Sequence, residues 1–570
     1  MKNHHRSFSI LLLWLAPVCF LILFYFYPLG SIFSLSFSRS QSGIFAPILQ
    51  AIQSPIPWRV LGFTLWQAIL STVLTLAIGL PGAYLFGHFN FKGKSILQAL
   101  TGIPFLMPTL VVAAAFNALL GPGGWINIGL MQIFKLSNPP IQFVNTLTAI
   151  LVAHVFYNTT IVLRTVGDFW SHLDPRVNQA ARMLGANRWQ AMRRITLPLL
   201  TPAIAAASLL VFIFDFTSFG VILILGGPHF ATLEVEIYYQ TVSLFNLPLA
   251  AVLSLLQLAC TLGLTILYTR LIRRLSIPLS LKSARVTHKK LSTKRSKIVA
   301  GVIIFTLLSI LIVPLAALSL RSVTRLEPNR GELTVSAPGF TLDFYRNLWV
   351  NSNESIFYTP PSTAIVVSLG YAIATTILAL LLGFPAALAL SRDANSHLSH
   401  ALDALLMLPL GTSAVTLGLG FIVALDKPPL DLRSSLLLVP LAHTLVAFPF
   451  VVRNLTPAFR SIQPRIRQAA ATLGASPGNV MRYIDIPMIG RSLLVAATFA
   501  FTISLGEFGA TSLIARPEYP TIPIAIYRLI SRPGESNYGQ ALALSTILMV
   551  VAGAAMFIID RSRIGEIGEF

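Results

Sequence analysis

The sequence predicts an all-α integral membrane protein of about twelve membrane-spanning helices, arranged in two homologous halves, and three observations support this prediction. Hydrophobic residues make up 55% of the 570 residues, whereas charged residues make up only 11%. Apolar runs of about 20 residues, the length with which an α-helix crosses a bilayer, recur along the whole chain. A polar stretch around Gly185 returns around Gly474, which indicates an internal duplication.

Twelve apolar runs are expected to form the spanning helices. They cover residues 10–30, 60–86, 98–120, 143–165, 200–227, 249–271, 299–320, 363–390, 401–424, 434–453, 490–515 and 538–560. Prolines within these runs, such as Pro81 and Pro385, are tolerated in membrane helices because neighbouring helices satisfy the freed backbone groups. The first run is long for the core of a signal peptide, and no small-residue cleavage motif follows it. We therefore expect it to remain as the first helix.

The net charge of +21 does not indicate a nucleic-acid partner, because the basic residues lie in the loops between apolar runs. Most of the 41 Lys and Arg fall in segments that are cytoplasmic if the N-terminus is cytoplasmic. An excess of positive charge on the cytoplasmic side is the usual arrangement in membranes. The sequence thus predicts that both termini lie inside. Cys19 and Cys260 are expected to be buried free thiols, since both lie in apolar runs and form no CxxC motif.

The duplicated stretch has the same internal spacing in both copies. Each copy contains Ala-Ala, a Gly four positions after it, and a Pro thirteen positions after the Gly. The offset of 289 residues between the copies also relates three further pairs: His154 and His443, Arg164 and Arg453, and Pro175 and Pro464. Upstream, Leu80-Pro81 resembles Phe384-Pro385 at an offset of 304 residues. The sequence therefore predicts two modules, residues 1–271 and 299–570, joined by a basic cytoplasmic linker, residues 272–298.

Both copies are polar and basic, and both lie between two spans on the predicted inner side. We expect Ala-Ala to start a short helix, the Gly to bend it, and a second helical piece to end near the Pro. Such a rigid helix end suits docking into a groove of a partner. The alternative is an amphipathic helix that only lies on lipid. Two copies at one offset favour docking.

These stretches resemble the EAA loop of binding-protein-dependent ABC transporter permeases, which has Glu-Ala-Ala, a Gly and a downstream Leu-Pro. Gln179 and Gln468 stand where that family usually has Glu, and Ile486 stands where it usually has Leu. The resemblance implies that residues 166–199 and 454–489 are coupling loops seated in a cytoplasmic ATPase dimer. The residues that it assigns to ATPase coupling are Gln179, Ala180, Ala181, Gly185, Leu197, Pro198, Gln468, Ala469, Ala470, Gly474, Ile486 and Pro487.

The same resemblance implies the partners and the location of the chain. An extracytoplasmic solute-binding protein would deliver the solute, and the ATPase subunits would bind and hydrolyse ATP. The chain itself would be a transport subunit, with no catalytic residues and no cofactor of its own, in the inner or plasma membrane. Within the chain, Gly93-Lys94-Ser95 lacks the earlier Gly of a phosphate-binding loop.

Two further motifs concern the solute. Asp215-Phe216-Thr217-Ser218-Phe219-Gly220 resembles the first half of fused thiamine permeases. Ser504-Leu505-Gly506-Glu507-Phe508-Gly509 resembles a motif shared by thiamine, ferric-iron, molybdate and sulfate permeases. The fused layout favours the thiamine and ferric-iron branches. The solute that the resemblance implies is therefore thiamine or ferric iron.

Four ionisable residues lie in or at the edge of apolar spans and are candidates for the solute pathway: Asp215, Glu507, His154 and His443. An ionisable group in a membrane is costly and is by default a functional candidate. A structural role, in which each acid pairs with backbone or a neighbouring helix, is the interpretation we favour. No second His or Cys stands at ligand spacing beside either histidine, so no metal site is predicted.

Two other classes of protein agree less well with the sequence. An ion-gradient-driven secondary transporter often carries an internal repeat, but the repeat is commonly inverted, whereas these halves run parallel. Such a transporter also leaves the paired Gly stretches unexplained. A membrane-embedded enzyme needs clustered catalytic carboxylates, or a nucleophile with a base, at one depth, and the sequence shows no such cluster. The permease is the better interpretation.

Overall fold

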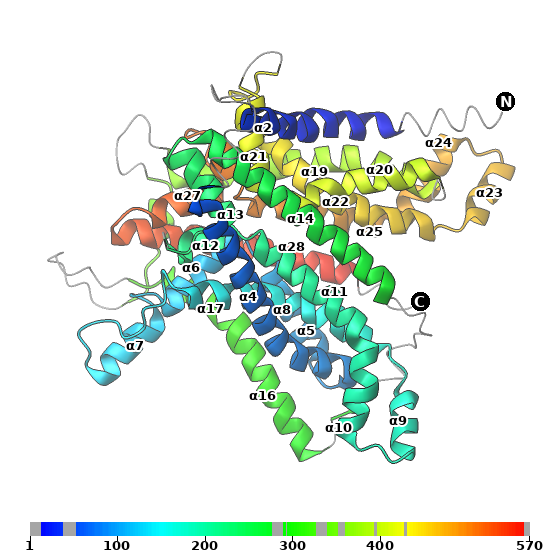
Figure 1. Cartoon of the computed structure of the whole chain (residues 1–570), viewed down its shortest axis with the longest axis horizontal. Coiled ribbons are helices and arrows are strands. Elements are labelled where there is room, and N and C mark those ends of the chain that lie inside the picture. Colours follow the sequence, from blue (N-terminus) through cyan, green and yellow to red (C-terminus); the bar gives the residue numbers. More distant parts are fainter. Residues whose placement is uncertain are drawn as a thin grey trace. The chain divides into compact units, whose positions relative to one another are not determined.

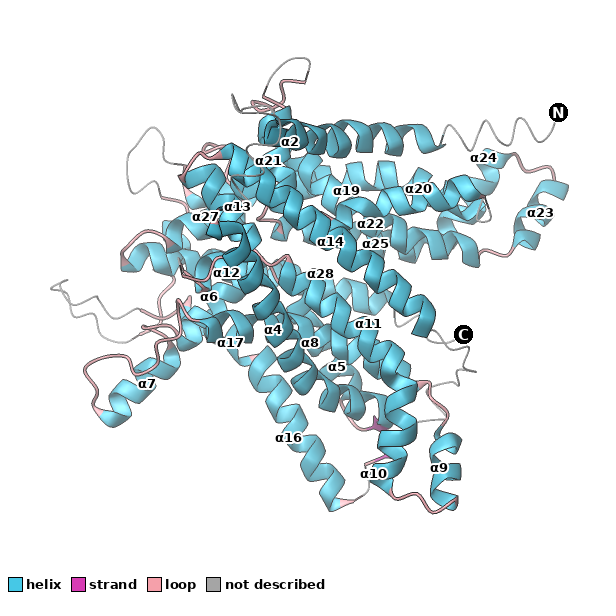
Figure 2. Ribbon diagram, in the orientation of Figure 1, coloured by secondary structure: helices cyan, strands magenta, loops and turns pink. Residues whose placement is uncertain are grey.

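The computed structural model describes residues 13–37, 53–227, 229–275, 289–291, 293–325, 339–350, 359–392, 396–426 and 430–563. These residues are mainly helical (Figures 1 and 2). As far as Lys290, the elements are η1 (Ile22–Phe26), α2 (Tyr27–Phe37), α4 (Pro55–His88), β1 (Phe89–Asn90), α5 (Lys94–Leu106), α6 (Thr109–Leu120), α7 (Trp125–Phe134), α8 (Leu147–Ser171), α9 (Pro175–Met183), α10 (Arg188–Ala191), η2 (Met192–Thr196), α11 (Leu197–Phe216), α12 (Gly220–Leu225), α13 (Leu233–Tyr238), η3 (Tyr239–Ser243), α14 (Leu247–Leu275) and β2 (Lys289–Lys290).

The elements that follow are α16 (Lys294–Leu311), α17 (Val313–Arg321), α18 (Asp343–Asn347), α19 (Pro361–Arg392), α20 (His397–Met407), η4 (Leu408–Gly411), α21 (Ala414–Ala424), α22 (Leu438–Ser461), α23 (Pro464–Thr472), α24 (Pro477–Val480), η5 (Met481–Asp485), α25 (Ile486–Gly506), α26 (Thr511–Ile514), α27 (Ile522–Ile530) and α28 (Glu535–Arg563). The two short strands, β1 and β2, pair in parallel.

Eleven helical segments of the described chain are long and apolar enough to cross a membrane, and the bent pair α20–α21 makes a possible twelfth. They occur in the order that the apolar runs predict. The predicted class, an all-α membrane protein of about twelve spans, is confirmed. Pro81 and Pro385 lie inside the long helices α4 and α19, as expected.

The helices in the third and ninth runs, predicted as spans at 98–120 and 401–424, are interrupted. In the first half α5 ends at Leu106 and α6 begins at Thr109. Pro108 explains this break, because the residue before a proline is pushed into extended conformation, and Met107 has φ −70° and ψ 133°. In the second half the helix is bent by 95° between Gly411 and Ala414.

The chain divides into two compact units that interleave in the sequence. One unit contains residues 1–53, 237–258 and 343–569, and the other contains 54–236 and 259–342. The first span thus packs within the unit of the second half, where the Tyr25 hydroxyl lies 2.6 Å from Thr412 Oγ1. The units therefore differ from the expected modules, 1–271 and 299–570, in the placement of their first spans and of residues 237–258.

The α16 helix, which begins the second half, belongs in turn to the unit of the first half. A Cβ atom added at Gly82 on α4 would come within 3.1 Å of Leu307 on α16. Much of the linker, residues 276–288, lies outside the described residues, as do Lys2 and Arg6 and the external segments 326–338 and 351–358.

Equivalent contacts hold each module together, which supports the duplication. A Cβ added at Gly79 would lie 2.7 Å from Val162, and one added at Gly383 would lie 2.5 Å from Val451. These pairs are related by the offsets of 304 and 289 residues. The same offsets relate two further contacts: the Thr64 hydroxyl accepts from Leu233 N at 3.0 Å, and the Ser368 hydroxyl accepts from Ile522 N at 2.7 Å.

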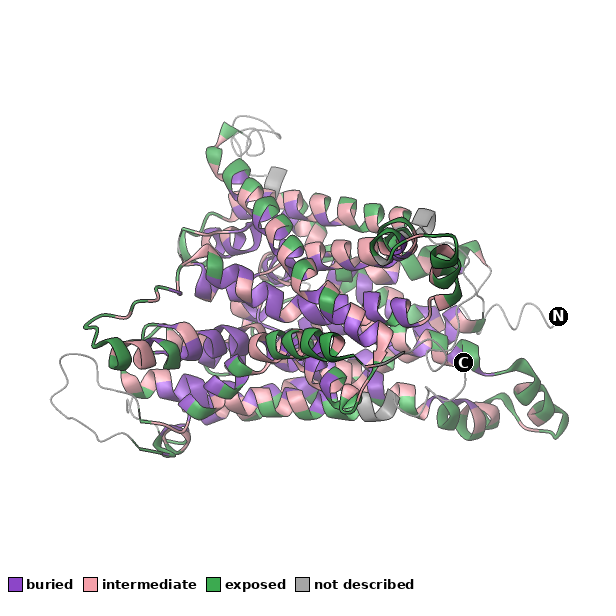
Figure 3. Ribbon diagram, turned by 90° about the horizontal axis from the view of Figure 1, so that it is seen from below, coloured by how far each residue is buried: buried purple, intermediate pink, exposed green. Residues whose placement is uncertain are grey.

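The outward faces of the spans are apolar. On α19 the large exposed side chains recur at helical spacing, namely Val366, Ile373, Ile377 and Leu381. Such a stripe suits contact with lipid tails. Figure 3 shows buried and exposed residues alternating along the helices. Cys19 is exposed and Cys260 is half-buried, so the expectation of buried thiols is wrong, because both lie on spans with an outward apolar face; both are free thiols.

Candidate functional site: two coupling loops and two buried histidine clusters

The two predicted coupling loops have the same succession of elements. In the first half α9, α10 and η2 lead into α11, and in the second half α23, α24 and η5 lead into α25. Each element begins at a position related to its counterpart by 289 residues. Figure 1 shows each loop at the end of the helices that flank it. The repeat therefore extends from sequence to local conformation.

Each loop helix ends in the same hydrogen-bond pattern. Ala186 N donates to the Ala181 carbonyl at 3.0 Å, and Ala475 N donates to the Ala470 carbonyl at 3.0 Å. Between them, Gly185 and Gly474 have φ of +89° and +85°. This is a Schellman motif, in which the residue after the helix takes the left-handed conformation that Gly adopts without steric cost. The expected bend at each Gly is confirmed.

The expected start of the loop helix is wrong. The α9 helix begins at Pro175, and Ala180-Ala181 lie in its second half, because the Asp174 carboxylate caps the helix by accepting from Arg176 N at 2.9 Å. Proline suits the first position of a helix, since its missing N–H needs no partner there. In the second half α23 begins equivalently at Pro464.

We expected the second helical piece to end near the proline, but it continues into the following span. A wider π turn makes this possible. Leu197 N bonds to the Met192 carbonyl, and Ile486 N bonds to the Met481 carbonyl, each five residues back. Pro198 and Pro487 follow at once; proline has no N–H to donate and its ring clashes with the carbonyl four residues back in a regular helix.

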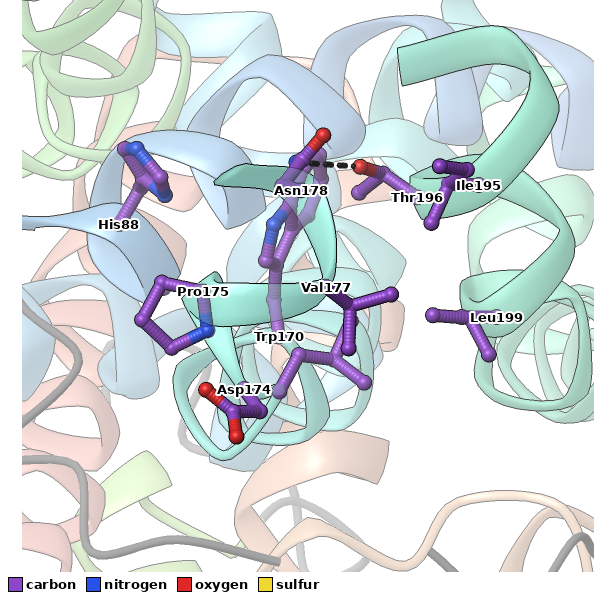
Figure 4. Close-up of a pocket in the computed structure, with 11 residues that line it drawn as sticks. His88, Trp170, Asp174, Pro175, Val177, Asn178, Ile195, Thr196 and Leu199 are labelled. Carbon is purple, nitrogen blue, oxygen red and sulfur yellow. Dashed lines mark hydrogen bonds between the residues drawn. The ribbon is translucent and has the colours of Figure 1, made fainter. Parts of the chain in front are cut away.

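A side-chain contact ties each loop helix to the start of the following span. In the first half Asn178 Nδ2 donates to Thr196 Oγ1 at 2.8 Å. Figure 4 shows this bond beside a small cavity of about 40 Å³, which has room for about one water molecule. In the second half Arg467 Nε donates to Asp485 Oδ1 at 2.7 Å. The two ties occupy equivalent positions, but one is neutral and the other ionic.

The outer surface of each loop carries an apolar residue that the sequence prediction missed. Leu184 and Leu473 are both 89% exposed, immediately before the left-handed Gly. The signal was present in the sequence, since the two leucines are 289 residues apart. Gln179 and Gln468 are also exposed. In the first half a hollow of about 670 Å³ opens beside the loop, lined by Gln179, Arg182, Met183, Gly185, Ala186 and Asn187.

The candidate pathway residues of the first half lie together. His154 on α8 and Asp215 on α11 are buried, and His154 Nδ1 lies 3.3 Å from Asp215 Oδ1. The other imidazole nitrogen, Nε2, lies 2.8 Å from Ser218 Oγ. Asn158, one turn after His154, donates to Asp215 Oδ1 at 2.6 Å, and Ser71 on α4 faces the same carboxylate.

The second half has a corresponding cluster around His443. Its Nδ1 lies 2.8 Å from Ser504 Oγ, and its Nε2 lies 3.2 Å from Glu507 Oε2 and 2.7 Å from Thr511 Oγ1. The Glu507 carboxylate accepts from Ala510 N at 2.8 Å and from Thr511 N at 3.0 Å. Ser504 in turn donates to Thr375 on α19 at 3.2 Å. Each histidine thus contacts the acid of its own half.

The clusters are buried within their units, and the four candidates are at most 8% exposed. The acids pair with a histidine, an amide side chain or the backbone of a helix start. This is the arrangement that the structural interpretation of the sequence expects. Ser218, Ser504 and Thr511 complete the clusters, and the sequence prediction did not single them out as site residues.

The chain is similar to known membrane transport proteins. Residues 79–277 match the family described as the inner membrane component of binding-protein-dependent transport systems. The chain is 29% identical to the thiamine transport system permease protein ThiP of Brucella abortus over 508 residues, which cover 89% of this chain and 88% of that protein. It is 26% identical to ThiP of Escherichia coli K12 over 86% of this chain and 87% of that protein.

Two other similarities were found. A probable ABC transporter permease protein, y4fN of Sinorhizobium fredii, is 25% identical over 89% of this chain and 88% of that protein. A solved bacterial ABC transporter involved in the import of the acidic polysaccharide alginate superposes with a TM-score of 0.41 at 19% identity, covering 48% of this chain and 99% of that chain. Residues 79–277 thus resemble the inner membrane component of binding-protein-dependent transport systems, and the multi-pass membrane chain as a whole is similar to permeases of such systems over nearly nine-tenths of its length.

Proposed function

We propose that this permease carries thiamine across the membrane as the fused transmembrane subunit of an ATP-driven importer. The support comes from the relatives named as thiamine transport permeases, which align with nearly nine-tenths of the chain. Ferric iron, the other solute that the motifs favour, has no such relative among those described above. Both duplicated modules, 1–271 and 299–570, would contribute to one solute pathway, with both termini in the cytoplasm.

The proposed coupling to ATP hydrolysis uses the two loops, residues 166–199 and 454–489. The observation that carries it is the repeated conformation, in which a left-handed Gly follows an exposed Leu in both halves. Exposed apolar side chains at a rigid helix end suit insertion into a pocket of a protein partner. The partner would be a pair of cytoplasmic ATPase subunits, one for each loop. Leu184 and Leu473 join the predicted coupling residues as the contacts that fill the pockets.

The other proposed partner is a solute-binding protein outside the membrane, which delivers thiamine to the permease. The four buried candidates, Asp215, Glu507, His154 and His443, are proposed to hold their modules together and not to contact the solute. Their mutual contacts within each unit support this assignment.

Uptake by proteoliposomes tests the transport proposal. The permease is reconstituted with its proposed ATPase and solute-binding protein partners, and radiolabelled thiamine is supplied outside with ATP inside. We expect uptake that vanadate abolishes and a protonophore leaves unchanged. Uptake that collapses with the protonophore and persists without ATP would identify an ion-gradient-driven transporter. Uptake of ferric iron in place of thiamine would overturn the solute.

A second experiment tests the loops. The double variant Leu184→Glu, Leu473→Glu should lose co-purification with the ATPase subunits, as should Gly185→Arg with Gly474→Arg. Leu136→Glu, at an exposed leucine outside both loops, is the matched control and should leave assembly unchanged. If the loop variants assemble and hydrolyse ATP as the wild type does, the loops are not the docking sites.

A further inference from the structure

The two histidine clusters contain the same groups in exchanged positions. Positions 215 and 504 are equivalent, as are 218 and 507, through the offset of 289 residues. The first half has Asp215 and Ser218, whereas the second half has Ser504 and Glu507. Each histidine presents Nδ1 to the earlier position and Nε2 to the later one. The imidazoles therefore face the same two positions, while the acid and the hydroxyl have changed places.

The alignment of the two halves that defines this exchange is fixed by landmarks both before and after the exchanged positions. The coupling loops that precede it correspond element by element at the offset of 289 residues. The pair Phe219-Gly220 after it corresponds to Phe508-Gly509 at the same offset. No insertion is needed between these landmarks, so a shift of the alignment does not explain the exchange.

Each acid has a donor that exists only in its own half. Asn158 donates to Asp215, and its counterpart in the second half is Ala447, which has no donor to offer. Thr511 donates to Glu507 from both its N–H and its hydroxyl, and its counterpart in the first half is Ile222. The supporting donor has thus moved with the acid. A buried carboxylate needs such hydrogen bonds, because an unpaired buried charge is strongly unfavourable.

The clusters lie at the helix ends far from the coupling loops. His154 is near the start of α8, whose other end leads into the first loop, and Asp215 is near the end of α11, which follows that loop. At 1.5 Å per residue, both lie about 25 Å from the loop. Within the α8–loop–α11 hairpin, Asn178–Thr196 joins the loop helix α9 to the start of the second span, and His154–Asp215 joins α8 to α11 at the far end.

The second half repeats this arrangement. His443 is near the start of α22, and Ser504 and Glu507 are at the end of α25. The tie beside its loop is Arg467–Asp485. In each half the histidine cluster joins the two spans at their far end, and the loop tie joins the loop helix to the start of the second span, so the two contacts together oppose sliding or splaying within the hairpin.

We infer that His154 with Asp215 and Ser218, and His443 with Glu507 and Ser504, are two interchangeable forms of one latch that makes each hairpin move as a rigid body. A displacement of the coupling loop then reaches the far end of the hairpin and is not absorbed between its helices. The latch residues are positioning residues that transmit the movement. This inference rests on the proposed coupling role of the loops, but it does not depend on the identity of the solute.

The test uses the full chain in complex with its ATPase, in lipid nanodiscs, with Cys19 and Cys260 replaced by Ser. Spin labels are placed at the exposed Asn138→Cys and Asp431→Cys, in the segments that precede α8 and α22. The distance between the labels is measured without nucleotide and with ATP and vanadate. The basal ATPase rate and the melting temperature are recorded for every variant. A defect in folding would change these two quantities as well, whereas loss of the latch should change only the response to nucleotide.

Three variants are compared with the wild type. The first is Asp215→Ser. The second transplants the second-half network into the first half through Asp215→Ser, Ser218→Glu, Asn158→Ala and Ile222→Thr. The third makes the reciprocal transplant through Ser504→Asp, Glu507→Ser, Ala447→Asn and Thr511→Ile. Asn158→Ala alone is the matched control for the lost donor.

We expect the wild type to change its distance distribution with nucleotide, and Asp215→Ser to lose at least half of this change while its basal ATPase rate stays within about twofold. The first transplant should restore the change that Asp215→Ser loses, and the reciprocal transplant should retain the wild-type change. Asn158→Ala alone should weaken the response, whereas the first transplant, which contains the same substitution, should respond as the wild type does. A wild-type response from Asp215→Ser overturns the inference, as do transplants that fail to restore the response or to assemble.

The outcome is separable from that of the thiamine experiment, since this measurement needs ATP and no solute. If the complex fails to import thiamine but shows the expected distance changes, the proposal that thiamine is the solute is wrong and the inference of the latch stands. If the wild type shows no nucleotide response, both the coupling proposal and the latch are wrong.

Discussion

Arg467 Nε donates to Asp485 Oδ1 at 2.7 Å, at the positions that Asn178 and Thr196 occupy in the first half. Asp485 is fully buried, whereas the Arg467 side chain is 27% exposed. The duplicated loops therefore use the same pair of positions with different chemistry. Loss of the ionic contact should cost more stability, because the buried Asp485 carboxylate would be left without the Arg467 guanidinium.

This difference predicts unequal effects of equivalent substitutions. Arg467→Ala leaves the Asp485 carboxylate buried and unpaired, which should cost about 3–5 kcal/mol. Asn178→Ala removes one neutral hydrogen bond and should cost about 1 kcal/mol. The double variant Arg467→Asn, Asp485→Thr, which copies the first half, should recover most of the stability. Thermal unfolding in detergent measures all three, and equal losses from the two single variants would contradict the prediction.

The left-handed glycines predict a second result. Gly185→Ala and Gly474→Ala meet no neighbouring atoms among the described residues, but they place a side chain at positive φ, which costs about 1–2 kcal/mol per residue. The loop helix should lose its fixed ending, and affinity for the ATPase should fall about tenfold. Gly478→Ala, in the same loop without positive φ, is the control and should bind normally. Affinity is measured by titrating labelled ATPase onto the permease, and normal binding by Gly474→Ala would contradict the expected effect.

The close approach of α4 to α8 predicts a third result. Gly79→Ala forces a Cβ to 2.7 Å from Val162, so the helices must separate, at a cost of about 1–3 kcal/mol. Gly383→Ala should behave alike against Val451. The companion change Val162→Ala should relieve the clash in the first half. Gly370→Ala on α19 faces open space among the described residues and serves as the control in the same melting assay. An unchanged melting temperature for Gly79→Ala would show that the helices adjust without cost.

Lys94 predicts a dependence of stability on pH. Its Nζ donates to the carbonyls of Phe86 and Phe89 at 2.6 and 3.0 Å. Burial lowers the pKa of Lys94 to about 8 from its ordinary 10.5, against the opposing attraction of Asp168. The folded protein therefore pays for the charged form below about pH 8, and this cost disappears as the pH rises from about 8 to 10.5.

The melting temperature of the wild type, relative to that of Lys94→Met, should accordingly rise between pH 8 and 10. Lys92→Met, at an exposed lysine two residues away, is the control for removal of one positive charge. A difference between wild type and Lys94→Met that stays constant or falls with pH would show that burial does not disfavour the charged ammonium group.

Local sequence patterns were sufficient to predict the membrane spans, the duplication and the bends at the two glycines. The composition of an apolar run of membrane-crossing length is enough to predict a helix, because in lipid every backbone N–H and C=O group must form its hydrogen bond within the helix. Gly185 and Gly474 could be predicted as bends since their role depends on their own backbone angles. The breaks at Met107 and near Thr412 were missed because the apolar pattern continues across them, although Pro108 was a local signal for the first.

The tertiary structure alone decided which distant residues meet. The sequence by itself determined that His154, His443, Asp215 and Glu507 stand in apolar spans, but not that each histidine faces the acid of its own half. It also predicted two successive modules, whereas packing places η1–α2 with the second half and α16 with the first. The physical reason is the same in both cases. The neighbouring residues in the sequence determine whether a residue is helical and buried, whereas the packing of separate helices determines which distant residue it contacts.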